Sequence, residues 1–100
     1  MSSPLLSVII CAHNPDQGRL QRVLDALRTQ TMPGPDWELL LIDNASHPPL
    51  TGRLDLSWHP LARICVENQL GLTWARLRGK TESTAALLVY VDDDNVLAPD

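Results

Sequence analysis

Four apolar runs divide the chain, and each has the length and flanking residues of a β-strand. The first is rich in β-branched residues and lies between Pro4 and Pro15, residues that interrupt strands. The last is apolar at every position, a pattern typical of a strand buried on both faces of a parallel sheet. The predicted strands are Leu5–Ala12, Trp37–Asp43, Arg63–Glu67 and Ala85–Val91.

Between the first two strands, the apolar positions change to the spacing of a helix. Asp16 is a candidate N-cap, because its side chain can accept a hydrogen bond from the free N–H groups of a first turn. The segment Met32–Pro35, with two prolines and a glycine, ends the helix in a turn. Four residues at i, i+3, i+4 and i+7 form its apolar face: Leu20, Val23, Leu24 and Leu27.

A second helix is predicted after the third strand, running to about Ser83. Its apolar positions recur at i, i+4 and i+7, as Leu70, Trp74 and Leu77. Ala75 and Gly79 offer this helix a thin face for close packing.

Three prolines and little periodicity mark the segment His47–Pro60 as irregular, with one short helix predicted over Leu50–Leu56. Trp37 and Trp74 are expected in the core rather than as platforms for a ligand.

Strands that alternate with helices predict right-handed crossovers and a parallel α/β sheet. Polar residues follow each strand: His13 and Asn14 the first, Asp43 and Asn44 the second, Asn68 the third, and an acidic cluster the fourth. Because the carboxyl ends of parallel strands meet at one edge, these residues are expected to lie together. Ligands bind at that edge, near the point where the strand order reverses.

Composition narrows the class of protein. With 100 residues, 44% hydrophobic and 20% charged, the chain is expected to form one small soluble domain. The net charge of −4 gives no basic surface for nucleic acid, and we expect none as a partner. The run Leu5–Ala12 is too short for a membrane span. Cys11 and Cys65 are interpreted as buried free thiols, which favours a reducing, cytoplasmic location.

The acidic cluster Asp92, Asp93 and Asp94 directly follows the last strand. Adjacent carboxylates repel one another, so either water or a divalent cation must stabilise them. Carboxylate oxygens suit Mg²⁺ or Mn²⁺, ions that often bind through one or two carboxylates together with substrate phosphates. The cluster alone leaves two interpretations open: a metal–diphosphate site or a solvated acidic loop.

Other nucleotide-binding classes fit less well. Gly79, Lys80 and Thr81 match the end of a P-loop, but Trp74 occupies the position of its first glycine. A nucleotidyltransferase would need a glycine-rich basic loop after the first strand, which is absent here. A magnesium-binding receiver or interaction module without catalytic activity remains an alternative, although Asp16 lies too late in the chain for the acidic residue that it needs after its first strand. The histidines share no spacing typical of a metal site.

Taken together, the segments resemble the amino-terminal half of a family 2 glycosyltransferase, which has the GT-A fold and uses nucleotide-diphosphate sugars. The resemblance runs over nearly the whole chain. Ser7–Asn14 is similar to the opening strand of the family, Glu38–Ser46 to its second strand, and Asn68–Gly79 to its Asn, Gly, Ala-Arg, Gly helix segment. Val91–Asn95 resembles its metal-binding DxD strand end.

The resemblance implies a role for each matched residue. The turn with Ala12, His13 and Asn14 would hold the base and ribose of the donor, together with Asp43 and Asn44. Asp92 and Asp94 would be the DxD pair that binds Mn²⁺ or Mg²⁺, with Asp94 closest to the metal and Asp93 near the ribose or sugar. Arg76 either helps to neutralise the diphosphate or is a solvated helix residue.

The resemblance also implies a division of labour within a longer enzyme. Many relatives have Pro-Thr-Tyr where this chain has Cys11, Ala12 and His13, and a second Asp where it has Asn44, which can change base preference. The general base of inverting members lies downstream of the DxD segment, and no stretch of this chain could supply it.

We therefore expect residues 1–100 to be the donor-binding half of a GT-A domain, with UDP- or GDP-sugar as ligand and no activity alone. The acceptor, a saccharide or lipid-linked molecule, would meet the rest of the enzyme, and the inner face of a membrane is compatible with its location. The sheet, truncated after about four strands, leaves an edge that a second copy could cover.

Overall fold

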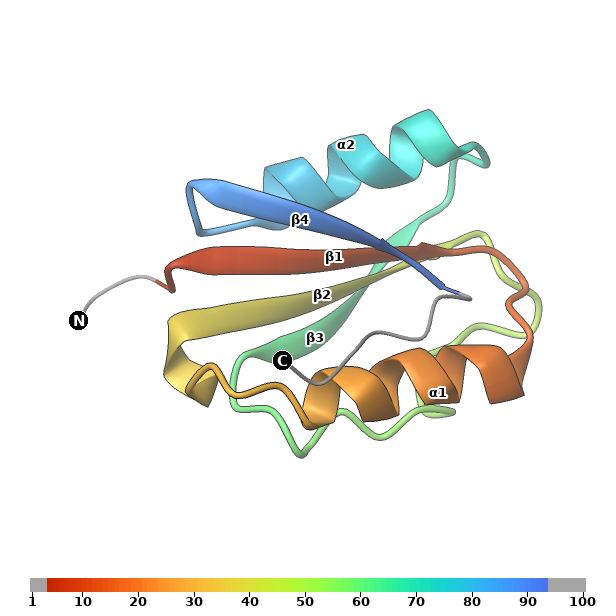
Figure 1. Cartoon of the computed structure of the whole chain (residues 1–100). Coiled ribbons are helices and arrows are strands. Elements are labelled where there is room, and N and C mark those ends of the chain that lie inside the picture. Colours follow the sequence, from red (N-terminus) through yellow and green to blue (C-terminus); the bar gives the residue numbers. More distant parts are fainter. Residues whose placement is uncertain (1–3, 94–100) are drawn as a thin grey trace.

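The structure, a computed structural model that describes residues 4–93, contains one parallel sheet with a helix on each face (Figure 1). The sheet has the order β3-β2-β1-β4. The elements are β1 (Leu6–Ala12), α1 (Gln17–Arg28), the one-turn helix η1 (Gly34–Asp36), β2 (Trp37–Asn44), β3 (Ala62–Glu67), α2 (Leu72–Glu82) and β4 (Leu87–Asp92). The four predicted strands and two main helices are confirmed, with boundaries shifted by one or two residues.

The layer between α1 and the sheet forms the larger core. All four residues of the predicted α1 face, Leu20, Val23, Leu24 and Leu27, are buried against the sheet. The Asp16 side chain accepts a hydrogen bond from Arg19 N at 2.9 Å, which confirms the predicted N-cap. On β2 every residue is buried, because both neighbouring strands and both helices cover it.

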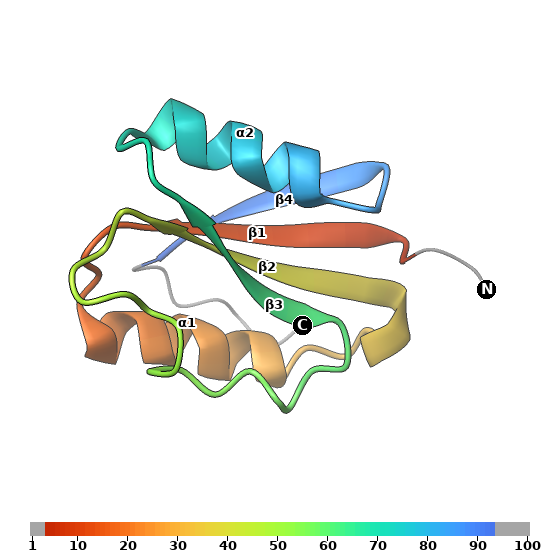
Figure 2. The same ribbon diagram turned by 180° about the vertical axis from the view of Figure 1, so that it is seen from behind.

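The opposite face is covered by α2, which packs unusually close to β1 (Figure 2). Ala75 and Gly79 are the buried residues of this helix, and a Cβ at Gly79 would lie 2.6 Å from Ile9 Cγ2. The predicted thin face is therefore the one that meets the sheet. The prediction that Trp74 belongs to the core is wrong: its side chain is 44% exposed, and Leu77 is 48% exposed, on the outward side of the helix.

The fourth strand differs from its sequence-based interpretation in burial. Within residues 4–93, β4 pairs only with β1 and forms an edge. None of its residues is buried, so the prediction of burial on both faces is wrong. Leu87, Val89 and Tyr90 are all exposed. An apolar run indicates that both faces of a strand favour burial. Whether they are buried depends on where the strand lies in the sheet and on what packs against it.

The segment between β2 and β3 contains turns rather than the predicted helix over Leu50–Leu56. Leu50 is fully buried, and its N–H donates to Asp43 Oδ2 instead of taking part in a helix. The side chains of Leu54 and Leu56 then pack from irregular backbone against the core on the α1 side of the sheet.

Both cysteines are free thiols, as predicted, with Cys65 buried and Cys11 only partly so. Within residues 4–93, no helix is long and apolar enough to cross a membrane.

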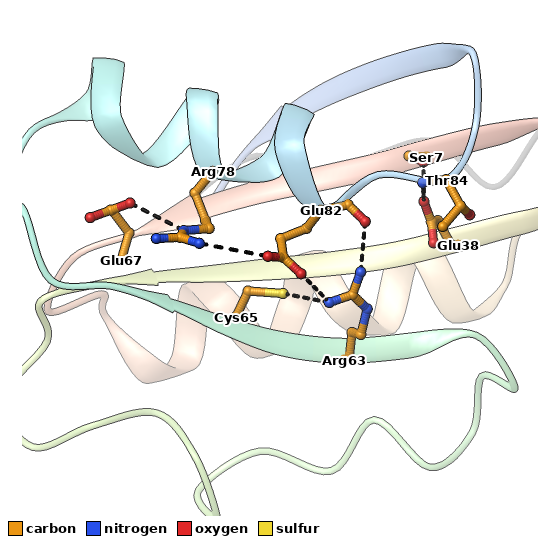
Figure 3. Close-up of polar contacts among 8 residues, drawn as sticks. All are labelled: Ser7, Glu38, Arg63, Cys65, Glu67, Arg78, Glu82 and Thr84. Atoms are coloured by element: carbon orange, nitrogen blue, oxygen red, sulfur yellow. Dashed lines mark hydrogen bonds and ion pairs between the residues drawn. The ribbon is translucent and has the colours of Figure 1, made fainter.

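A network of hydrogen bonds and ion pairs connects α2 to β3, on the side away from β4 (Figure 3). Arg63 on β3 donates to the Glu82 carboxylate and to its backbone carbonyl, each at 2.7 Å. Arg78 lies 3.2 Å from Glu67 and 3.6 Å from Glu82. The hydrogen bond from Arg63 lowers the pKa of Glu82. Because these groups face solvent, we assign them a role in orienting the helix rather than in stability.

Candidate functional site

The polar residues that follow the strands lie together at the carboxyl edge of the sheet, as predicted. The register aligns the ends, with Ala12 opposite Asp43 and Cys11 opposite Asp92. The strand order reverses at β1, whose two neighbours, β2 and β4, both follow it in sequence. This is the position where open α/β sheets bind ligands.

The turn after β1 is held to the loop after β2 by hydrogen bonds. His13 Nδ1 lies 2.7 Å from Asn44 O, and because a carbonyl can only accept, Nδ1 carries the proton. Asn14 has a φ of 43°, a left-handed conformation that Asn tolerates better than most residues. Its N–H donates to Ser46 Oγ, and its Oδ1 accepts from His47 N at 2.7 Å.

The Asp43 side chain accepts hydrogen bonds from the loop that follows it. The side chain is 1% exposed, and its two oxygens accept hydrogen bonds from Ser46 N at 3.1 Å and Leu50 N at 2.9 Å. Two backbone donors compensate the buried carboxylate and fix the course of the chain after β2. Contact between this carboxylate and a nucleotide base stays a prediction.

Asn44 connects β2 to the start of α2. Its amide nitrogen donates to Glu67 O at 3.0 Å and to Gln69 O at 2.9 Å, while its oxygen accepts from Gly71 N at 2.9 Å. Gly71 has a φ of 140°, which side-chain-bearing residues rarely adopt. The amide therefore sets the position at which the helix begins, a role that the sequence did not reveal.

Two adjoining clefts open at this edge. One, of about 370 Å³, is lined by His13, Ala12 and Asn44 from the strand ends and by Gly71 from the start of α2. The other, of about 340 Å³, lies between α2 and the end of β4. Three residues line both clefts: Cys11, Leu72 and Asp93. The two spaces thus form a continuous surface across the reversal of strand order.

Cys11 lies where the two clefts meet, and its chemistry is that of a neutral thiol. Burial raises the pKa of the thiol to about 11, with Arg76 acting in the opposite sense and Asp93 in the same sense as burial. A protonated thiol is a poor nucleophile, so the arrangement does not favour covalent catalysis at this residue.

The second cleft brings a cation near the acidic strand end. Arg76 on α2 lines it together with Tyr90, Asp92 and Asp93. The Arg76 guanidinium carbon lies 5.8 Å from the centre of the Tyr90 ring, and the Tyr90 hydroxyl donates to Arg76 O at 3.0 Å. Sequence reasoning missed Tyr90, although strand alternation places it on the same face of β4 as Asp92, two residues later.

The carboxylates at the end of β4 are only part of the predicted metal site. Asp92 is exposed and Asp93 partly buried, whereas Asp94 lies outside the described residues. Within residues 4–93, no group of three His, Cys, Asp or Glu side chains could form a complete metal cage. Binding of Mg²⁺ or Mn²⁺ at this strand end stays a prediction.

Comparison with protein families matches residues 7–100 to the model described as glycosyl transferase family 2. Among curated proteins, the glycosyltransferase AglE of Haloferax volcanii is 30% identical over 94 residues, which cover 91% of this chain and 31% of that protein. The protein y4gI of Sinorhizobium fredii is 28% identical over 103 residues, covering 99% of this chain and 11% of its own length. The chain therefore spans at most about a third of these relatives.

Among solved structures, the crystal structure of S. aureus TarS 1–349 matches with a TM-score of 0.83 at 17% identity, covering 95% of this chain and 29% of TarS 1–349. The structure of TarS 1–349 in complex with UDP-GlcNAc matches with a TM-score of 0.78 at 17% identity, over 95% of this chain and 28% of that one. The four-stranded parallel sheet and its two helices thus correspond to the amino-terminal part of the GT-A fold of TarS.

Proposed function

This chain belongs to glycosyl transferase family 2, and from that premise we propose that it is the donor-nucleotide-binding part of a metal-dependent glycosyltransferase. Such an enzyme transfers a sugar from a nucleotide-diphosphate sugar to an acceptor hydroxyl. The observation that carries the proposal is the continuous pair of clefts at the reversal of strand order, with Arg76 beside Asp92 and Asp93 on the rim.

The first cleft is proposed to take the base and ribose. His13 and Ala12 line it from β1, and Asn44 lines it from β2. Asn14 and Asp43 support this cleft through the loop contacts that fix the turn after each strand. TarS has been crystallised with UDP-GlcNAc, which makes UDP the first nucleotide to test and GDP the second.

The second cleft is proposed to take the diphosphate. Negative charge builds on the leaving diphosphate as its bond to the sugar breaks, and cationic groups placed in advance offset that charge. When bound, Mn²⁺ or Mg²⁺ would supply Lewis acidity. Asp92 and Asp94 would hold the ion, Asp93 would contact the ribose or sugar, and Arg76 would meet the phosphate oxygens directly.

Sugar transfer itself is proposed to need more than this chain. Residues 1–100 span 29% of the matched TarS chain, and we assign no residue in them the role of general base. We expect the isolated chain to bind donor weakly and to leave a UDP-sugar unreacted. Release of UDP by the purified chain with an acceptor present would contradict this expectation.

The test is a calorimetric titration of the chain with UDP and with GDP, each with and without Mn²⁺. We expect binding that depends on Mn²⁺ and that Asp94→Ala abolishes. Asp25→Asn, which changes one exposed carboxylate on α1, is the matched control and should bind like the wild type. A folded chain that binds Mn²⁺ or Mg²⁺ but neither nucleotide would overturn the proposal and favour a metal-binding module without transferase activity.

A further inference from the structure

We propose that Tyr90 is a positioning residue, which holds Arg76 on the rim of the cleft where the donor diphosphate is expected; this inference rests on the function proposed above. Tyr90 belongs to β4 and Arg76 to the middle of α2, so the pair joins two elements that meet at the site.

Two contacts from one side chain act on the same residue. The Tyr90 hydroxyl donates to the backbone carbonyl of Arg76 at 3.0 Å, which fixes the helix above the strand. The Tyr90 ring lies 5.8 Å from the Arg76 guanidinium carbon, within the range of a cation–π contact. The first contact places the Arg76 backbone, and the second limits where its long side chain can go.

The cation that Tyr90 contacts belongs to the cleft. Arg76 and Tyr90 line the same 340 Å³ space as Asp92. Arg76 also acts electrostatically on Cys11, where the two clefts meet. Among the described residues that line either cleft, Arg76 is the only Lys or Arg. Arg78, two residues later, is paired with Glu67 and Glu82 on the other side of the helix.

Holding this cation in place has a physical benefit. An exposed Arg side chain has many rotamers, and binding a phosphate would cost the entropy of fixing one of them. A side chain that already rests on an aromatic ring loses less freedom when the ligand arrives. Tyr90 would therefore favour diphosphate binding without touching the ligand.

The experiment compares two ligands that differ only in the diphosphate. Affinities of the chain for UDP and for uridine are measured in Mn²⁺, by calorimetry and by ligand-observed NMR. Tyr90→Leu should weaken UDP binding about two- to fivefold, the range expected for loss of an exposed cation–π contact, and leave uridine binding unchanged. Tyr90→Phe, which keeps the ring, should retain most of the affinity for UDP.

A double-mutant comparison separates positioning from general damage. In an Arg76→Met background, Tyr90→Leu should cause no further loss of UDP affinity, because Tyr90 acts through Arg76. Val89→Ala, on the opposite face of β4, controls for weakening of the strand and should affect UDP and uridine alike, if at all. Independently of any ligand, NMR signals of the Arg76 side chain should lose their ring-current shift in Tyr90→Leu and keep it in Tyr90→Phe.

The outcomes distinguish this inference from the function on which it rests. A wild-type chain that binds neither UDP nor GDP would overturn both. Wild-type binding together with equal losses of UDP and uridine in Tyr90→Leu, or with a further loss in the Arg76→Met background, would overturn the positioning role alone. Absence of a ring-current shift at Arg76 would overturn it as well.

Discussion

At the scale of single residues, buried polar side chains outside the recognised motifs also hold parts of the fold in place. Glu38 is 6% exposed near the amino-terminal end of β2, beside Ser7 and Thr84 (Figure 3). Its carboxylate accepts hydrogen bonds from Ser7 Oγ and, at 2.7 Å, from Thr84 N. Burial disfavours the charged form, but these hydrogen bonds outweigh it and lower the pKa of Glu38.

This environment predicts how stability depends on pH. Because the pKa of Glu38 is lower in the folded chain than the value of about 4.3 for an unfolded chain, its contribution is present above that value and is lost as pH falls through the folded pKa. Glu38→Gln should lower the free energy of unfolding at pH 7 by about 1–3 kcal/mol. In urea unfolding measured from pH 7 to pH 3, the difference in the free energy of unfolding between Glu38→Gln and the wild type should become smaller as the pH falls.

The surface variant Asp25→Asn provides the charge control for this experiment, because it removes one carboxylate from the exposed side of α1. A gap between Glu38→Gln and the wild type that stays constant over the whole pH range would contradict an ionised, hydrogen-bonded Glu38.

Asn44 is a second polar side chain whose hydrogen bonds within the chain shape the structure, here at the candidate site. From the sequence, the family resemblance leads us to expect a second Asp at this position. In the structure its amide nitrogen donates to two backbone carbonyls, those of Glu67 and Gln69. A carboxylate could not make these bonds, because it has no hydrogen to donate when ionised. The residue type at this position therefore follows from the loop that it holds as well as from any ligand.

At the scale of elements, the two helices use different solutions to cover the sheet. Four large aliphatic residues on α1 interdigitate with the sheet, whereas α2 makes contact through Ala75 and Gly79. The small residues bring the α2 backbone close to β1, with Ile9 filling the space over Gly79. The close approach also brings Arg76 within reach of the strand end.

The same substitution in each helix should therefore have opposite effects. Gly79→Ala places a Cβ 2.6 Å from Ile9 Cγ2, an overlap that costs about 1–3 kcal/mol and outweighs the helix propensity gained. Gly18 occupies an exposed position of α1, and the nearest atom to a Cβ added there would be Asp16 Oδ1 at 3.4 Å. Gly18→Ala should therefore raise stability by up to about 1 kcal/mol. Thermal unfolding of both variants measures the difference, and equal stabilisation by both would contradict the close packing of α2.

At the scale of the whole molecule, the part of the sheet that the structure describes ends at an apolar edge strand, β4. Leu87 is 58% exposed and Val89 is 39% exposed on β4. An apolar cleft of about 210 Å³ runs between that strand, β1 and α1, and Trp37 and Met32 contribute to its lining. Among the described residues, β4 has a strand partner on one side only, and strand edges that carry exposed apolar side chains tend to associate.

We expect the isolated chain to self-associate through β4. Sedimentation should show an average mass that rises with protein concentration. Val89→Lys, a charge placed on the edge, should shift the chain toward the monomer, whereas Lys80→Glu on α2 should not. A wild-type chain that stays monomeric at all concentrations would contradict this prediction.

The sequence by itself determined the elements and their chemistry. Periods of two and 3.6 residues, together with prolines and caps, reflect local backbone preferences, so the four strands, both main helices and the Asp16 cap were predictable. The position of His13, Asn44 and Asp92 at one edge also followed, because parallel strands must align their carboxyl ends.

Only the tertiary structure decided which neighbours each face meets. It made β4 an edge, turned Trp74 outward because Ala75 and Gly79 pack more closely, and placed Leu50 in the core without a helix. It also engaged Asp43 with the backbone of its own loop and set Tyr90 beside Arg76. The packing of β4, Trp74 and Tyr90 depends on contacts between residues far apart in the chain, which local preferences do not encode. The Asp43 contacts are local, but they depend on the course of an irregular loop, which the sequence pattern does not specify.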